Sequence, residues 1–150
     1  FLAWIDDLER DAHDVGVSLP EGSFEIVDDY RWALRDVAHP IFTHWDLWDG
    51  NVFVDPVRGS VTGIIDFERS MWADPLIEQN FRNPNAALLD GYGFDPRTGD
   101  AARARRALYD LHLFLIMVIE CRFREFEPDH EAWCRAQLDA TIDSLRRSSR

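Results

Sequence analysis

The sequence predicts an α+β fold that is mainly helical, with one β-hairpin at its centre, formed by a single domain over residues 1–150. Apolar residues recur at helical spacing near both ends of the chain. Two β-rich runs occur only in the middle, on either side of a turn sequence. The composition, with 46% hydrophobic and 29% charged residues, is typical of a folded chain. A chain of this length can bury a core without help from metals or disulfides.

Two helices are expected in the N-terminal part. The first has an apolar face formed by Leu2, Ile5, Leu8 and Ala12, which are spaced three or four residues apart. Gly16 is expected to end this helix. Ser23 can cap the second helix. Its apolar face contains Ile26, Tyr30, Ala33 and Val37. Pro40 disfavours helical backbone at His39, so we expect this helix to end there.

The central part predicts short extended segments and loops. Ile41–Thr43 reads as extended, and residues 44–51 are polar without helical period, which indicates a loop. The β-rich runs 51–55 and 61–66 flank the turn sequence 56–60, so they predict a hairpin. Residues 67–100 are irregular, except for a short helix from Pro75 to Arg82 with Asp74 as its N-cap.

The C-terminal part predicts a long helix from Asp100 to about Glu125, followed by a last helix from Pro128. The run Leu113–Ile119 is apolar all round, which predicts a buried central helix. That run is far shorter than the ~20 residues that span a bilayer, so no membrane partner is expected. The last helix has an apolar face formed by Cys134, Leu138, Ile142 and Leu145. Cys121 and Cys134 are both expected in the helical core.

Charge and cysteine content limit the function classes. The formal net charge is −12, and all 16 basic residues are Arg. A nucleic-acid partner needs clustered positive charge and is therefore not expected, whereas cationic small molecules or metal ions would be attracted. Two cysteines are too few for a disulfide framework, which favours a reducing compartment. With no signal-peptide pattern at the start, we expect a cytoplasmic protein.

The central loop and hairpin contain the chemically informative residues. The loop reads His44-Trp45-Asp46-Leu47-Trp48-Asp49-Gly50-Asn51, and the hairpin is followed by Ile64-Ile65-Asp66-Phe67-Glu68 and by Asp74-Pro75. This pattern resembles the catalytic and metal-binding loops of the protein-kinase-like superfamily. Within it, the chain is most similar to the aminoglycoside phosphotransferase family of antibiotic and small-molecule kinases. The resemblance implies a kinase-like C-terminal lobe with the hairpin next to the catalytic loop.

The resemblance also implies a role for each residue of the motif. Asp46 would be the catalytic residue that accepts a hydrogen bond, and then the proton, from the acceptor hydroxyl. Asn51 and Asp66 would bind Mg²⁺ that bridges the phosphates of ATP or GTP. His44 and Asp74 would support the loop. Asp46 and Asn51 can also be read as plain loop-capping and turn residues, which the complete motif disfavours.

The chain departs from the family pattern in three respects. The family usually has Gly where Trp45 stands, and protein kinases have Lys where Trp48 stands. The Gly-rich loop, phosphate-binding Lys and Glu partner of an N-terminal nucleotide-binding lobe have no counterpart before Asp46. We expect the N-terminal nucleotide-binding lobe to be a missing partner of this chain, either removed or naturally absent. The C-terminal lobe alone is then expected to be inactive.

The resemblance implies a small, cationic hydroxyl acceptor, with an aminoglycoside or related antibiotic as the prime class. Residues expected to contact it are Trp48, Asp90, Asp95 and Glu127. The Asp-Leu-Trp-x-Gly-Asn sequence also resembles ketosamine kinases, which makes a sugar amine the alternative acceptor. A non-catalytic kinase-like binding module is a further alternative. A metal-dependent hydrolase would need additional ligands at metal-binding spacing, and the sequence does not offer them.

Overall fold

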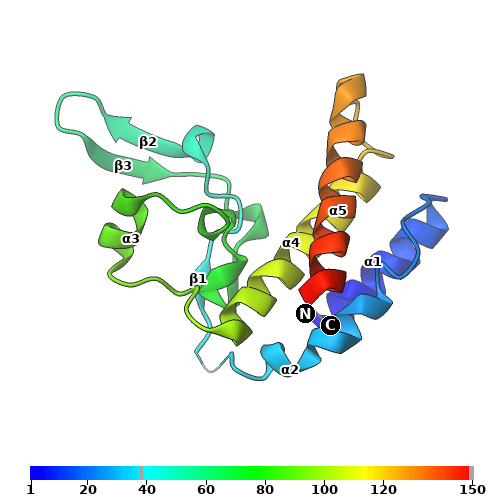
Figure 1. The fold of residues 1–150 in the computed structure, drawn as a ribbon. Coiled ribbons are helices and arrows are strands. Elements are labelled where there is room, and N and C mark those ends of the chain that lie inside the picture. Colours follow the sequence, from blue (N-terminus) through cyan, green and yellow to red (C-terminus); the bar gives the residue numbers. More distant parts are fainter. Residues whose placement is uncertain (38, 149–150) are drawn as a thin grey trace. The chain divides into compact units, whose positions relative to one another are not determined.

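The computed structural model describes residues 1–37 and 39–148, and it confirms an α+β fold that is mainly helical (Figure 1). The chain divides into two compact units. The helical unit contains residues 1–34 and 107–150, and the loop unit contains residues 35–106. Helix α4 (Asp100–Glu120) contributes its first residues to the loop unit and the remainder to the helical unit.

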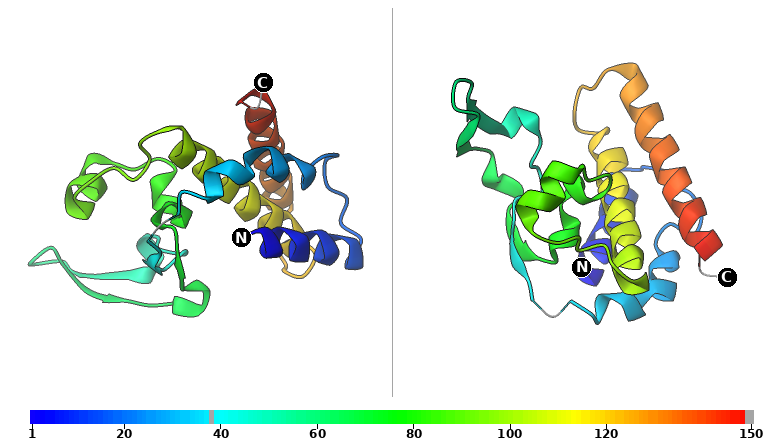
Figure 2. Two further views of the ribbon diagram at one scale, coloured as in Figure 1. Left: turned by 90° about the horizontal axis from the view of Figure 1, so that it is seen from below. Right: turned by 60° about the vertical axis from the view of Figure 1, so that its left-hand side comes forward.

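The helical unit is built around α4 and α5 (Pro128–Ser148), which run antiparallel in Figure 2. The predicted apolar face of α5 is confirmed, because Cys134, Leu138, Ile142 and Leu145 are all buried. The apolar run of α4 is largely buried as well, which confirms the central helix. Helix α1 (Leu2–Asp14) has the predicted buried face formed by Ile5, Leu8 and Ala12. Within residues 1–37 and 39–148, no helix combines the length and apolarity needed to cross a bilayer.

Several predictions about the helices were wrong. The second helix is a 3-10 helix, η1 (Glu25–Tyr30), followed by one α-helical turn, α2 (Arg31–Leu34). Ser23 does not cap it, because its hydroxyl donates back to the Pro20 carbonyl. Helix α4 ends at Glu120 instead of about Glu125, since the charged segment that follows offers no apolar face to bury. Cys121 therefore lies in a turn.

The loop unit contains two small antiparallel sheets. Strands β2 (Val52–Asp55) and β3 (Ser60–Ile64) form the predicted hairpin, with Val52 opposite Ile64 at its base (Figure 1). Strand β1 (Ile41–Thr43) pairs with β4 (Met71–Ala73), a strand that the sequence did not predict. The β1–β4 pairing brings together the two ends of the segment 44–70. That segment contains the whole loop and hairpin of the sequence motif.

The segment after β4 is less helical than predicted. The expected helix from Pro75 to Arg82 is instead two 3-10 turns, η4 (Pro75–Ile77) and η5 (Gln79–Phe81). Helix α3 (Ala86–Tyr92) was not predicted, although its end signals are present. The Asn85 side chain caps it by accepting from the Leu88 N–H at 2.8 Å. Gly93 ends the helix with a φ of +90°, in the left-handed region.

Candidate active site

Four residues form a closed ring of hydrogen bonds at the base of the β2–β3 hairpin. Asn51 Nδ2 donates to the Asp46 carbonyl at 2.9 Å, and the Asp46 N–H donates to His44 Nδ1 at 3.3 Å. His44 Nε2 is 2.9 Å from the Ile65 carbonyl, and the Ile65 N–H donates to the Asn51 carbonyl at 3.1 Å. The ring fixes the loop 44–51 to the residue that precedes Asp66.

The two contacts of the buried His44 ring determine its tautomer. A backbone N–H can only donate, so the contact with Asp46 makes Nδ1 an acceptor. The Ile65 carbonyl can only accept, so the proton is on Nε2. The ring also packs against Phe67, with 4.7 Å between the ring centroids. Both ring nitrogens of His44 therefore hold backbone in place, which fits a supporting role rather than that of a base.

Asp46 and Asn51 face each other within the loop. Asp46 is half-buried, and its Oδ2 lies 3.4 Å from Asn51 Nδ2. Asn51 is buried, and its amide nitrogen contacts both the carbonyl and the carboxylate of Asp46. Because the nitrogen is engaged in this way, the side-chain oxygen is the atom that Asn51 offers to a cation.

Asp66 lies just beyond the end of β3, one residue after Ile65, whose N–H donates to the Asn51 carbonyl at the hairpin base. Its side chain is exposed, and its φ of +66° places the backbone in the left-handed region. Among residues other than glycine, Asp and Asn tolerate this region best. The pairing of Val52 with Ile64 brings Asn51 and Asp66 out of the same end of the hairpin. Amide and carboxylate oxygens are the hard donors that Mg²⁺ prefers, so this donor set fits the ion that the family implies.

The loop is also held from outside by residues that the sequence analysis missed. The Glu78 carboxylate accepts hydrogen bonds from the backbone N–H groups of His44 and Trp45. The Trp45 nitrogen lies 3.0 Å from Glu78 Oε1 and 3.1 Å from Oε2. Asn80 Nδ2 donates to the Leu47 carbonyl at 2.8 Å. In sequence, Glu78 and Asn80 look like ordinary polar residues of the short helix predicted there. The β1–β4 pairing places this segment against the loop. The sequence analysis did not predict that pairing, so it did not identify these two residues.

Trp45 occupies an unusual position for a bulky residue. Its φ is +62°, in the region that glycine adopts without steric cost, and this is the position at which the family usually has Gly. The side chain is only 8% exposed, and the Arg69 guanidinium carbon lies 5.9 Å from the centre of its ring. Trp45 is buried, whereas the other tryptophans of the chain are exposed.

Asp74 anchors the segment that carries Glu78. As predicted, it caps the following turn, since its Oδ1 accepts from the Leu76 N–H at 3.0 Å. Its Oδ2 accepts from Arg105 Nε at 2.6 Å in a buried ion pair. The neighbouring Arg106 is also buried and donates to the carbonyls of Leu76 and Glu78, the latter at 3.0 Å. Asp74 thus acts on the loop indirectly, through the backbone around Glu78.

A pocket of about 270 Å³ opens beside Asp46. Its lining is mostly polar and consists of Asp46, Leu47, Trp48, Gln79, Asn80, Arg82 and Asn83. Trp48 is 62% exposed and presents an aromatic surface next to Asp46. An acceptor molecule bound here would lie beside the Asp46 carboxylate.

The remaining predicted substrate residues lie elsewhere. Asp90 is exposed on α3, and Glu127 is exposed in the helical unit, just before α5. Asp95 forms a two-point ion pair with Arg97, at 2.9 and 2.8 Å. Hydrogen bonds from Arg97 hold the pKa of the Asp95 carboxyl below its usual value. None of these three residues lines the pocket beside Asp46, and Asp95 could bind an ammonium group only by sharing its carboxylate with Arg97.

Comparison with known proteins gives two matches. Residues 2–101 match the model of the phosphotransferase enzyme family. The fold is similar to that of a thermostable mutant of the aminoglycoside phosphotransferase APH(4)-Ia in its apo form, with a TM-score of 0.60 and 23% sequence identity. This likeness covers 96% of the chain and 52% of the other protein, so the chain spans about half of its length. No curated protein matches the chain significantly in sequence.

Proposed function

The chain belongs to the phosphotransferase enzyme family, and on that premise we propose that it carries the catalytic loop of a small-molecule kinase. The reaction would move the terminal phosphate of ATP or GTP to a hydroxyl group of a small, cationic acceptor such as an aminoglycoside. The observation that carries this proposal is the hydrogen-bond ring that unites His44, Asp46 and Asn51 with the residue before Asp66.

In this proposal Asp46 positions the acceptor. Its half-buried carboxylate lies at the edge of the pocket, where it can accept a hydrogen bond from the acceptor hydroxyl and then its proton. The contacts of Asn51 with the Asp46 carbonyl and carboxylate restrict the orientations that Asp46 can adopt. Such restriction is what a phosphoryl transfer requires, because positioning provides much of its rate enhancement.

Asn51 and Asp66 would hold the metal. The Asn51 side-chain oxygen and the Asp66 carboxylate are the oxygen donors that leave the hairpin base together. When bound there, Mg²⁺ would neutralise negative charge on the nucleotide phosphates. Asp66 contributes the negative charge of this pair, so we expect it to matter more than Asn51 for metal affinity.

The acceptor would occupy the pocket beside Asp46. Trp48 can pack against a sugar ring or an amine. The net charge of −12 favours a cationic molecule over an anionic one. A sugar amine is the alternative acceptor. The chain spans about half of an aminoglycoside phosphotransferase, so we expect ATP or GTP binding to need an N-terminal nucleotide-binding lobe.

Two substitutions separate the proposed roles of the carboxylates, in the protein that carries this chain together with a nucleotide-binding lobe. Asp46→Asn should lower turnover by about 10²–10⁴-fold, the usual contribution of general-base assistance, with little change in nucleotide affinity. Asp66→Asn should lower both turnover and metal-dependent nucleotide affinity, because it removes a negative charge from the metal site. Steady-state kinetics and nucleotide binding at saturating Mg²⁺ measure both quantities.

Asp49→Asn is the matched control, since Asp49 is an exposed acid of the same loop. It should behave like the unchanged protein in both assays. Near-normal turnover of Asp46→Asn on a verified acceptor would show that Asp46 only shapes the loop, and the proposed mechanism would then be wrong. Aminoglycosides and sugar amines tested as acceptors in the same assay distinguish the two substrate classes.

A further inference from the structure

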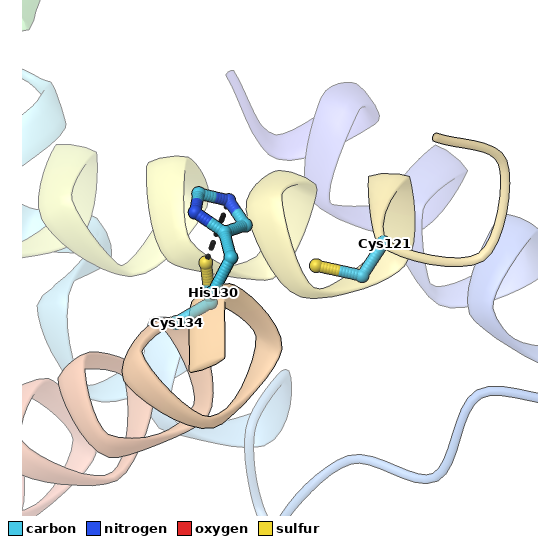
Figure 3. Close-up of side chains that lie close together, drawn as sticks. All are labelled: Cys121, His130 and Cys134. Carbon is cyan, nitrogen blue, oxygen red and sulfur yellow. Dashed lines mark hydrogen bonds between the residues drawn. The ribbon is translucent and has the colours of Figure 1, made fainter. Parts of the chain in front are cut away.

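A cluster of two cysteines and one histidine lies in the helical unit and takes no part in the loop chemistry. Cys121 is in the turn that begins where α4 ends, while His130 and Cys134 are four residues apart near the start of α5 (Figure 3). Residues four apart lie on the same side of a helix. One ligand atom from each of the three side chains lies within 4.8 Å of the other two.

The spacing of these atoms is close to that of a tetrahedral zinc site. With Zn–S near 2.3 Å and Zn–N near 2.0–2.1 Å, tetrahedral angles give a sulfur–nitrogen separation of about 3.6 Å and a sulfur–sulfur separation of about 3.8 Å. Cys134 Sγ is 3.4 Å from His130 Nε2, which already matches. All three atoms lie within 4.8 Å of one another. Each separation from the Cys121 sulfur therefore needs to shorten by no more than about 1.2 Å to reach that geometry.

Surrounding contacts already orient the three side chains. The His130 ring is packed against Phe126, with 4.2 Å between the ring centroids. Cys134 is fully buried on the inner face of α5, whereas Cys121 belongs to a turn and can adjust. In Figure 3 the Cys121 side chain extends from the end of α4 toward the other two. Its Sγ makes a weak hydrogen bond to the Met117 carbonyl at 3.1 Å, which it can give up for a metal.

We propose that Cys121, His130 and Cys134 bind one Zn²⁺ ion, with water as its fourth ligand. Two thiolates and an imidazole are the donors that zinc prefers, and they differ from the oxygen donors expected for Mg²⁺ in the loop unit. No fourth His, Cys, Asp or Glu joins this cluster in the part of the chain that the structure describes. Water can reach the ion because Cys121 and His130 are only partly buried.

The ion would tie the end of α4 to the beginning of α5 across the connection 121–127. A metal that crosslinks two helices stabilises the folded state, because the unfolded chain does not present the three ligands together. The role of the ion would therefore be structural.

The test begins with the reduced 150-residue chain after treatment with a chelator. Zn²⁺ titrated against a chromophoric competitor should bind at one equivalent per chain and raise the melting temperature. Co²⁺, a spectroscopic substitute for Zn²⁺, should give a sulfur-to-metal charge-transfer band together with the visible bands of tetrahedral cobalt. Zn²⁺ should also protect both cysteines from alkylation.

Variants at the two more accessible ligands assign the site. Cys121→Ser and His130→Gln should each weaken Zn²⁺ binding by at least about 100-fold and abolish the Zn²⁺-dependent rise in melting temperature. His13→Gln, which removes an exposed histidine from the same unit, should bind Zn²⁺ like the unchanged chain. Circular dichroism without metal checks that each variant folds. If one does not, the Co²⁺ spectrum of the unchanged chain decides the question.

Three results would overturn the proposal. The first is a reduced chain that does not bind one equivalent of Zn²⁺. A chain that binds no Zn²⁺ and whose two cysteines form a disulfide on oxidation would count as the same result. The second is a Co²⁺ spectrum without the thiolate band. The third is unaltered Zn²⁺ affinity in a folded Cys121→Ser or His130→Gln variant.

Discussion

Glu78 provides the sharpest test of how the loop 44–51 is held in place. Its carboxylate accepts the backbone N–H groups of His44 and Trp45, and both of these residues are buried. Glu78→Ala removes the acceptor and leaves two buried donors without it. We therefore expect this substitution to destabilise the loop unit and to displace the residues that precede Asp46.

The size of the effect follows from the two lost hydrogen bonds. Leaving a buried donor unsatisfied costs about 1–3 kcal/mol, and water entering the space recovers part of that cost. For two donors we expect Glu78→Ala to lower the free energy of unfolding by about 2–4 kcal/mol. Glu78→Gln keeps an acceptor oxygen and loses the charge, so the loss should be about 1 kcal/mol. Stabilities of about 5–15 kcal/mol are usual, which makes the Ala variant easy to detect.

The assay is urea unfolding, followed by circular dichroism and by tryptophan fluorescence, since Trp45 is buried in the loop unit. Glu68→Ala is the control, because Glu68 is an exposed acid close to the same motif. Substitutions at such surface positions usually change the free energy of unfolding by about 0.5 kcal/mol at most. If Glu78→Ala were no more destabilising than Glu68→Ala, the carboxylate would not hold the loop.

Two further predictions concern other buried residues. Burial lowers the pKa of His112 in the folded chain to about 4, whereas a histidine in the unfolded chain has a pKa of about 6.5. As the pH falls through this range, the unfolded chain is protonated first, which favours unfolding. Between pH 7 and pH 4, the unfolding free energy of the unchanged chain should therefore fall by roughly 3 kcal/mol more than that of His112→Gln. His13→Gln, at an exposed histidine, should follow the unchanged chain. Trp45 has a left-handed backbone conformation. Substitution by Gly or by Ala removes the buried indole in both cases, but only Ala keeps the steric clash of a Cβ atom in this conformation. Trp45→Gly should thus be about 1 kcal/mol more stable than Trp45→Ala in the urea assay, and the opposite order would show that the backbone there is not strained.

Local chemistry made the hairpin and the long helices predictable. The turn sequence 56–60 separates two β-rich runs, and Asp55 sets the turn by accepting the N–H groups of Val57 and Arg58. The faces of α1 and α5 follow from apolar spacing, which burial then matches. The candidate residues Asp46, Asn51 and Asp66 could be named from the sequence because they belong to one contiguous motif and its hairpin.

Tertiary contacts decided what the sequence analysis missed. Strand β4 is very short and gains its strand character by pairing with β1, which lies on the far side of the loop and hairpin in the sequence. Glu78 is one acid among many, and its position against the loop depends on that pairing. The clustering of Cys121 with His130 was also hidden, because it requires the chain to turn back between α4 and α5. Each of these features rests on a contact that no local pattern encodes.

The backbone of the site shows how its geometry is maintained. Within residues 1–37 and 39–148, the non-glycine residues with positive φ are Trp45 and Asp66. One immediately precedes Asp46, and the other is the proposed metal ligand itself. Each such residue costs about 1–2 kcal/mol, and the cost persists only where surrounding interactions outweigh it. The ring through His44 and Asn51 and the hydrogen bonds of Glu78 are those interactions. Hydrogen bonds to a charged group such as Glu78 are worth about 1.5–3 kcal/mol each. The strain therefore lies at Asp66 and immediately before Asp46, the two carboxylates of the proposed mechanism, which is the pattern expected of a preorganised site.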